Sequence, residues 1–198
     1  VTTTPLASAA GVTCVGTSCS IANLPTGAYH MDSDLTITSY SHLAGSHVLL
    51  LVNGDAAINT NIKTPSDVGN LLVLAAKKNI YIDPNVGKST FALPCINSSC
   101  TNLEGIFTAE ESIILQSLGD TCAEGETPDK QLNLAGTFIT NSLKPFKVGG
   151  TGIFQNRRSL CAQDANFPSF TIQSRYDFVP QLTDFYKAPS VRWKEVNP

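Results

Sequence analysis

The sequence predicts an all-β fold: a β-solenoid or β-helix-like stack of short strands with disulfide-stapled loops and an aromatic C-terminal cap. Three observations support this prediction: a strand-prone composition, a loose internal repeat and six cysteines. Charged residues make up only 15% of the chain, and Lys and Glu, which usually cover helix surfaces, are scarce. Because no segment sustains the apolar spacing of a helix, we expect at most one short helix, around residues 180–185.

The internal repeat consists of three or four apolar residues, a polar turn and then alternating apolar positions. Its copies begin at Gly27, Leu51, Val73, Ile106 and Leu132. A spacing of roughly 20–30 residues with two β-rich runs per copy is typical of coils that bury their apolar side chains only against neighbouring coils. The alternative is a β-sandwich whose strands merely resemble one another.

Stacked coils would place their polar turns above one another, at the strand spacing of about 4.8 Å. The sequence therefore predicts an inter-coil charge column, which begins near Asp32 and Asp34 and continues through Asp55, Lys77, Lys78, Glu110 and Glu111. The two lysines would lie between acidic neighbours and offset the repulsion between like charges. Since each exposed pair contributes only ~0–1 kcal/mol, this column would set the register of the coils more than their stability.

The six cysteines predict disulfides rather than a metal site. Two pairs share the spacing C-x4-C, and the remaining two cysteines pair by elimination. The predicted bonds are Cys14–Cys19, Cys95–Cys100 and Cys122–Cys161. Free thiols and a zinc site are the alternatives, but the chain lacks the second pair of ligands that a zinc knuckle requires at short spacing. Disulfides indicate an oxidising compartment, so we expect an extracellular or cell-surface location.

The repeat divides the chain into three parts. Residues 1–26 form an N-terminal segment with the Cys14–Cys19 loop, residues 27–160 form the coils, and residues 161–198 form a C-terminal capping segment. Aromatic residues are concentrated in the last part and would cover the open end of the coils or run back along one flank. A sugar-binding or partner-docking surface is the alternative role. Arg157 and Arg158 are expected on the surface near Cys161.

Candidate catalytic residues are sparse. Three histidines near acidic residues could bind a divalent metal or assist a serine, although loop residues that face water are the favoured interpretation; they are His30, His42 and His47. The charge column could supply parts of a carbohydrate-active enzyme. Motifs of hydrolases and zinc proteases are missing, so the sequence predicts neither a catalytic residue nor a metal or other cofactor.

Four segments carry a resemblance to a known group of proteins. They are LEGIFTAE from Leu103, QLNLAGTFI from Gln131, RYDFV from Arg175 and WKEVNP from Trp193. Over about residues 47–198 the chain resembles the C-terminal module of large predicted bacterial surface proteins. More loosely, its coils resemble polymer-forming β-solenoids of the bactofilin type. The resemblance implies an extracellular β-rich module without an assigned activity, and it names no catalytic residue.

Composition narrows the range of partners. The net charge is −3 and no run of Lys or Arg is present, which argues against a nucleic-acid partner. The longest apolar stretch, residues 48–52, is too short to span a bilayer. We therefore expect a non-enzymatic extracellular structural or adhesive module that associates with itself or with other cell-surface proteins. A more specific form is a filament subunit whose N-terminal residues 1–11 add as a strand to a neighbour. A carbohydrate-binding or carbohydrate-active module is the alternative.

Overall fold

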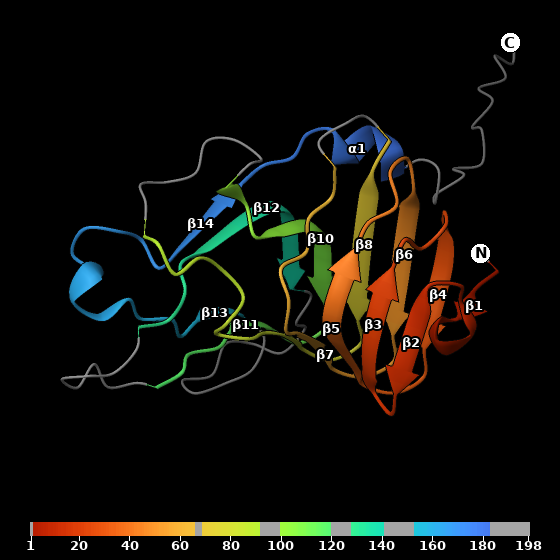
Figure 1. Ribbon diagram of the computed structural model, residues 1–198, viewed down its shortest axis with the longest axis horizontal. Helices are drawn as coiled ribbons and strands as arrows, with labels where there is room; N and C mark the ends of the chain where they lie inside the picture. Colours follow the sequence, from red (N-terminus) through yellow and green to blue (C-terminus); the bar gives the residue numbers. More distant parts are fainter. Residues whose placement is uncertain (1, 66–68, 92–99, 120–127, 141–152, 183–198) are drawn as a thin grey trace, which may run out of the picture.

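The computed structural model describes residues 2–65, 69–91, 100–119, 128–140 and 153–182, and these form two sheets of seven strands each (Figure 1). The first sheet contains, in spatial order, β1 (Thr4–Pro5), β4 (Gly27–Met31), β6 (His47–Val52), β8 (Leu71–Ala76), β10 (Leu103–Ala109), β12 (Leu132–Thr140) and β14 (Phe170–Gln173). The second contains β13 (Phe154–Asn156), β11 (Ile113–Leu115), β9 (Ile80–Ile82), β7 (Ala56–Ile58), β5 (Leu35–Ser41), β3 (Ser18–Ala22) and β2 (Val12–Val15). The named helices are η1 (Leu6–Ser8), η3 (Cys161–Gln163) and α1 (Phe178–Gln181), and each is short.

The β-solenoid prediction is wrong, whereas the mostly-strand class is confirmed. The finding that overturns it is a pair of sheets in which the named strands pair in parallel, apart from the antiparallel β2 and β3. A solenoid repeats near-identical coils, but the segments that return from the second sheet to the first differ greatly in length, from residues 23–26 to residues 83–102. The β-sandwich alternative fails as well, because such sandwiches are built from antiparallel sheets. An apolar repeat shows that strands alternate, but it does not specify how the chain returns between them.

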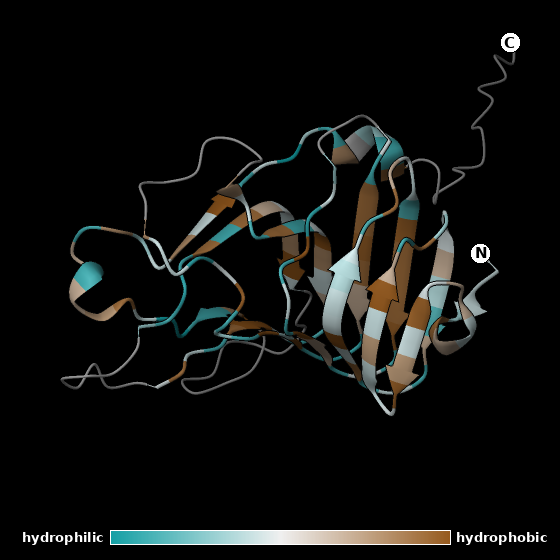
Figure 2. Ribbon diagram, viewed as in Figure 1, coloured by the Kyte–Doolittle hydropathy of each residue, from teal (hydrophilic) through white to brown (hydrophobic). Residues whose placement is uncertain are grey.

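The core lies between the two sheets and follows from a period of two along each strand. In β6, Val48, Leu50 and Val52 are buried, whereas the intervening residues are only partly buried. Figure 2 shows hydrophobic residues running along the strands of the first sheet. Neighbouring strands align their inward positions, so that Leu50 lies beside Leu74 in the register. One continuous apolar cluster therefore joins both sheets.

Cysteine bonding and the N-terminal segment close one end of this core. Cys14 and Cys19 face each other on β2 and β3 and form the predicted disulfide. Leu6, in η1, is 1% exposed and belongs to the core cluster. The preceding β1 pairs Thr4 with Tyr29 on β4. The N-terminal segment thus packs on its own chain.

The remaining predicted disulfides are only partly described. Cys100 and Cys161 are each disulfide-bonded. The predicted pairings with Cys95 and Cys122 lie outside the described residues. The prediction of disulfides is therefore confirmed for Cys14–Cys19, and the other two pairings stay predictions.

The predicted aromatic cap also needs correction. Phe170 extends a line of rings at the end of the core, with a centroid 5.6 Å from that of Phe154. Phe178, in contrast, is 1% exposed and packs on the outer face of the first sheet. Tyr176 is 82% exposed, and the aromatic residues beyond 182 lie outside the described part. The short helix α1 begins slightly earlier than expected and lies above the first sheet (Figure 1).

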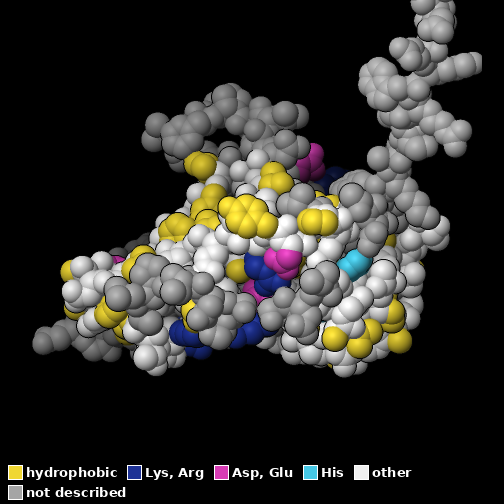
Figure 3. All heavy atoms as spheres, turned by 90° about the horizontal axis from the view of Figure 1, so that it is seen from above, with side chains coloured by type: hydrophobic (Ala, Val, Ile, Leu, Met, Phe, Trp, Pro, Cys, Tyr) yellow, Lys and Arg dark blue, Asp and Glu magenta, His cyan; other side chains and the backbone are white. Residues whose placement is uncertain are grey.

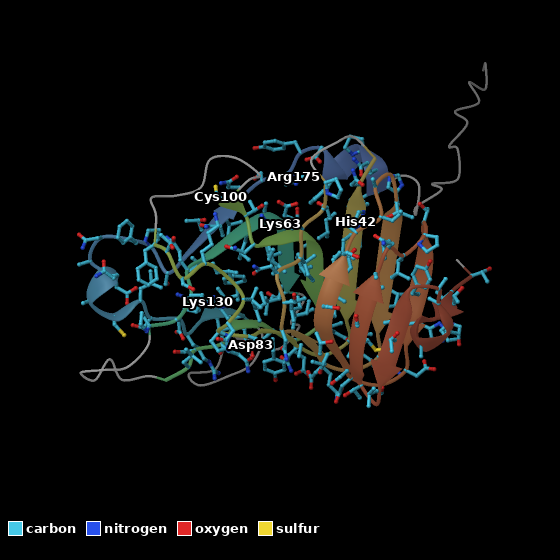
Figure 4. All side chains as sticks on the ribbon, in the orientation of Figure 1. His42, Lys63, Asp83, Cys100, Lys130 and Arg175 are labelled. Carbon is cyan, nitrogen blue, oxygen red and sulfur yellow. A yellow bond between two sulfur atoms is a disulfide. The ribbon has the colours of Figure 1, made fainter. Side chains whose placement is uncertain are left out.

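Arg158 is buried, although the sequence places it on the surface with Arg157. Its side chain donates hydrogen bonds to the carbonyl oxygens of Val86 at 2.6 Å, Lys130 at 2.7 Å and Asp83 at 2.7 Å. Figure 4 shows Asp83 and Lys130 in one part of the molecule. Burial lowers the pKa of Arg158 to about 10, so the side chain is still protonated at neutral pH. This residue ties together loops that are distant in the sequence.

No helix among the described residues has both the length and the apolar character needed to cross a membrane.

Candidate binding groove

Four turns of three residues lead from the first sheet to the second. They comprise residues 32–34, 53–55, 77–79 and 110–112. The strands before and after them are in parallel register, with Val52 beside Ala76 on one side and Ala56 beside Ile80 on the other. Equivalent positions of successive turns therefore stack at the spacing of neighbouring strands, about 4.8 Å.

The third residue of each turn bonds to the next turn, and we call this set the turn ladder. Its members are Asp34, Asp55, Asn79 and Ser112. Asp34 Oδ1 accepts a hydrogen bond from the backbone N–H of Asp55 at 2.9 Å, and Asp55 Oδ1 accepts one from that of Asn79 at 2.9 Å. Asn79 Oδ1 accepts from the N–H of Ser112 at 3.1 Å, and Ser112 Oγ accepts from that of Ile153 at 3.4 Å. The ladder thus provides acceptors for N–H groups just before strands of the second sheet.

Asn79 is the centre of the turn ladder because its side chain both donates and accepts. Its Nδ2 donates to Asp55 Oδ1 at 3.0 Å and to Glu111 Oε2 at 3.3 Å. An amide between two carboxylates avoids the repulsion that a third carboxylate would add. The negative charge of this edge extends to Tyr81, whose pKa is raised by burial first and then by Asp55 and Glu111.

We predict that Asn79→Ala lowers the free energy of unfolding by about 2 kcal/mol. The reason is that the N–H of Ser112, a residue that is 1% exposed, loses its acceptor. Urea denaturation of the purified protein measures this difference. Asn53→Ala is the matched control, because Asn53 is an exposed residue of the equivalent turn. Its replacement should lower the free energy of unfolding by less than about 0.5 kcal/mol. Equal losses for the two variants would contradict a structural role of the ladder.

The predicted charge column is divided between three parallel columns. Asp55 belongs to the turn ladder at the third turn position, Lys77 and Glu110 occupy the first position, and Lys78 and Glu111 occupy the second. Within the described part of the chain, no ion pair joins any two of these five residues. The partner of Asp55 is Asn79, which charge counting overlooked. The sequence pattern that indicates this interaction is a polar residue at the last position of each turn.

A groove lies on the outer face of the first sheet, where β4, β6, β8 and β10 run into the turns. Its volume is about 350 Å³. The floor is formed by side chains that point away from the core, namely His30, Leu51, Ala75 and Thr108. The rim is formed by the first residue of each turn, namely Asp32, Asn53, Lys77 and Glu110. Each of the four strands therefore contributes one floor residue, and the turn that follows it contributes one rim residue.

The chemistry of the groove is mixed. Its rim carries two carboxylates, an amide and an ammonium group, above a floor with small and apolar side chains. His30 Nε2 lies 3.8 Å from Asp32 Oδ2 at one end. The Nδ1 atom of His30 is buried and has no hydrogen-bond partner in the described part of the chain. The groove can thus offer both donors and acceptors to a ligand, but it has no single dominant charge.

The three histidines do not form a common site. His30 lines the groove, His47 begins β6, and His42 lies in the loop between β5 and β6. His42 Nδ1 is 2.8 Å from the Tyr40 hydroxyl and its Nε2 is 3.0 Å from the carbonyl oxygen of Ser46. Burial lowers the pKa of His42. Among the described residues there is no group of three or more His, Cys, Asp or Glu that could hold a metal.

A buried ion pair on the same face was not predicted. Glu104, on β10, is 1% exposed, and its Oε2 accepts hydrogen bonds from the N–H of Thr64 at 2.9 Å and from its Oγ1 at 3.1 Å. The hydroxyl of Thr101 donates to the other carboxylate oxygen. Arg175 Nη1 approaches Glu104 Oε2 at 3.3 Å. In the sequence, a single Glu inside the apolar segment LEGIF is the feature that could have indicated a buried, paired carboxylate.

Arg175 fixes the C-terminal segment to the first sheet. Two of its nitrogens donate to the carboxylate of Asp177 at 2.8 and 2.7 Å, and its guanidinium lies 4.5 Å from the ring centroid of Phe178. The hydrogen bonds between Arg175 and Asp177 raise the pKa of the guanidinium and lower the pKa of the carboxyl group. Figure 4 places Arg175 on the upper side of the molecule, and from above acidic and basic side chains gather among hydrophobic ones (Figure 3).

The docked segment and the groove share one face. Phe178 packs on Val73 and Ile106, which are two residues before the floor residues Ala75 and Thr108 on β8 and β10. Two residues along a strand correspond to about 7 Å. Of the described residues, those around Phe178 therefore cover the apolar part of this face, and the groove lies beside the turns.

Comparison with models of protein families, with curated proteins and with solved structures found no match. The resemblance to bacterial surface modules and to bactofilins therefore stays an expectation. The function of the groove is argued from its own geometry.

Proposed function

We propose that this protein is a non-enzymatic extracellular module that adheres to a surface partner through the groove. The observation that carries the proposal is the placement of the groove on paired strands whose turns are held by the turn ladder. Side chains on such elements are positioned before the partner arrives, which reduces the entropy lost on binding. The Cys14–Cys19 disulfide supports an oxidising location outside the cell.

Adhesion can be tested with beads that carry the oxidised protein and flow over fixed cells of differing surface chemistry. We expect beads with the unmodified protein to be retained, and beads with Lys77→Ala/Glu110→Ala to be retained at least about tenfold less, which corresponds to 1.4 kcal/mol. Lys78→Ala is the matched control, since Lys78 is adjacent and also exposed but does not line the groove. The proposal would be contradicted if no beads were retained, or if beads with Lys77→Ala/Glu110→Ala were retained as well as beads with the unmodified protein.

The filament form of this proposal would use strand addition at the ends of the sheets. Thr4 and Pro5 already pair with β4 of their own chain, and Leu6 is buried in the core of the same chain. Addition by this segment would therefore require it to leave its own sheet. Electron microscopy of concentrated protein tests this form. Regular filaments would support it, and uniformly monomeric particles would contradict it without affecting adhesion through the groove.

A further inference from the structure

We infer that the ligand of the groove is an uncharged or N-acetylated polysaccharide that lies across the strands. This inference rests on the proposed adhesive function and names the partner class of the same site. It follows from the repeat of the groove, from the pairing of its strands and from the charges of its rim.

The groove repeats its polar groups at a regular interval. One rim side chain follows another from strand to strand, from Asp32 through Lys77 to Glu110, at steps of about 4.8 Å. An extended polysaccharide advances by a similar distance with each sugar ring and presents hydroxyl groups at each step. A ligand that repeats therefore matches a site that repeats, and several weak contacts can add up along it.

A peptide strand fits the groove less well. Strands β6, β8 and β10 each lie between two hydrogen-bonded neighbours, and β1 pairs with β4 at His30. Their backbone groups are used within the sheet, so an added peptide strand would find no free edge over the floor. The floor residues Leu51 and Ala75 are aliphatic side chains of a shallow surface rather than the walls of a deep pocket for a large anchoring side chain.

The rim chemistry suits hydroxyl groups. Carboxylates accept from hydroxyls, the ammonium of Lys77 donates, and the amide of Asn53 does both. The apolar floor residues Leu51 and Ala75 can contact the C–H face of a sugar ring while the rim bonds to its edge. A polyanionic glycan is disfavoured, because two of the three charged rim groups are carboxylates and the whole chain carries a net charge of −3.

Sedimentation with insoluble polysaccharides tests this inference directly. The probes are amorphous cellulose and chitin, with calcium-gelled alginate as a polyanionic comparison. We expect the protein to bind at least one of the first two and not alginate. Lys77→Ala and Glu110→Gln should each weaken binding about tenfold, whereas Lys78→Ala should bind like the unmodified protein. Binding to neither neutral probe, binding to alginate alone, or equal effects of the two lysine variants would overturn the inference.

The bead assay separates this inference from the proposed function. Periodate cleaves the vicinal diols of 1,4-linked neutral sugars on the target cells, chitinase hydrolyses N-acetylated chains that lack such diols, and protease treatment removes protein receptors. Loss of retention after periodate or after chitinase, with retention preserved after protease, supports a polysaccharide partner. Loss after protease alone overturns the polysaccharide inference but leaves an adhesive module in place. Absence of retention on untreated cells would instead refute the proposed function.

Discussion

Gly136→Ala is expected to lower the free energy of unfolding by about 4 kcal/mol. Gly136 on β12 pairs with Gly105 on β10 and has φ of 136°. A Cβ at Gly136 would lie 1.9 Å from the carbonyl oxygen of Gly105. Because this neighbour is backbone, the two strands would have to separate, and the cost of a backbone conformation that side chains rarely adopt would be added.

The measurement is urea denaturation, with Gly45→Ala as the control. Gly45 has φ of 77°, but no atom lies within 4 Å of the position of its Cβ. An alanine at position 45 would adopt an unfavourable backbone conformation without meeting a neighbouring atom. We therefore expect Gly45→Ala to lower the free energy of unfolding by about 1 kcal/mol. A similar loss for the two variants would show that the close approach of β10 and β12 is not what requires glycine.

Arg158→Met is expected to lower the free energy of unfolding by about 3–5 kcal/mol. The substitution removes the donors to three carbonyl oxygens, those of Asp83, Val86 and Lys130. Arg158 is 5% exposed, so water cannot readily replace these donors. Methionine has similar length and preserves apolar packing, which restricts the change mainly to the lost hydrogen bonds.

Arg157→Met is the matched control for Arg158→Met. Arg157 is exposed, and its side chain donates to Gln155 at 3.0 Å. We expect its replacement to change the free energy of unfolding by less than about 0.5 kcal/mol. Thermal unfolding monitored by circular dichroism will distinguish the two variants. A comparable loss of stability from both would mean that the buried guanidinium is not the element that joins the loops.

Much of the strand content could be predicted from local patterns. In β6 the alternation of buried and partly buried residues follows directly from the period of two in a strand. The candidate site could be predicted only in part. Lys77 and Glu110 were expected near each other because their turns were recognised as equivalent, and both line the groove. Asn79 was overlooked because a neutral amide does not stand out in an argument based on charge.

The sequence by itself determined the features that depend on neighbours in the chain: the alternation of the strands, the equivalence of the polar turns and the short Cys14–Cys19 disulfide. Only the tertiary structure decided the arrangement into two mostly parallel sheets and the contacts between distant segments. Arg175 meets Glu104 across 71 residues, and Arg158 meets Val86 across 72. The physical reason is that such pairs depend on how each segment returns between the sheets, and no local period contains that information.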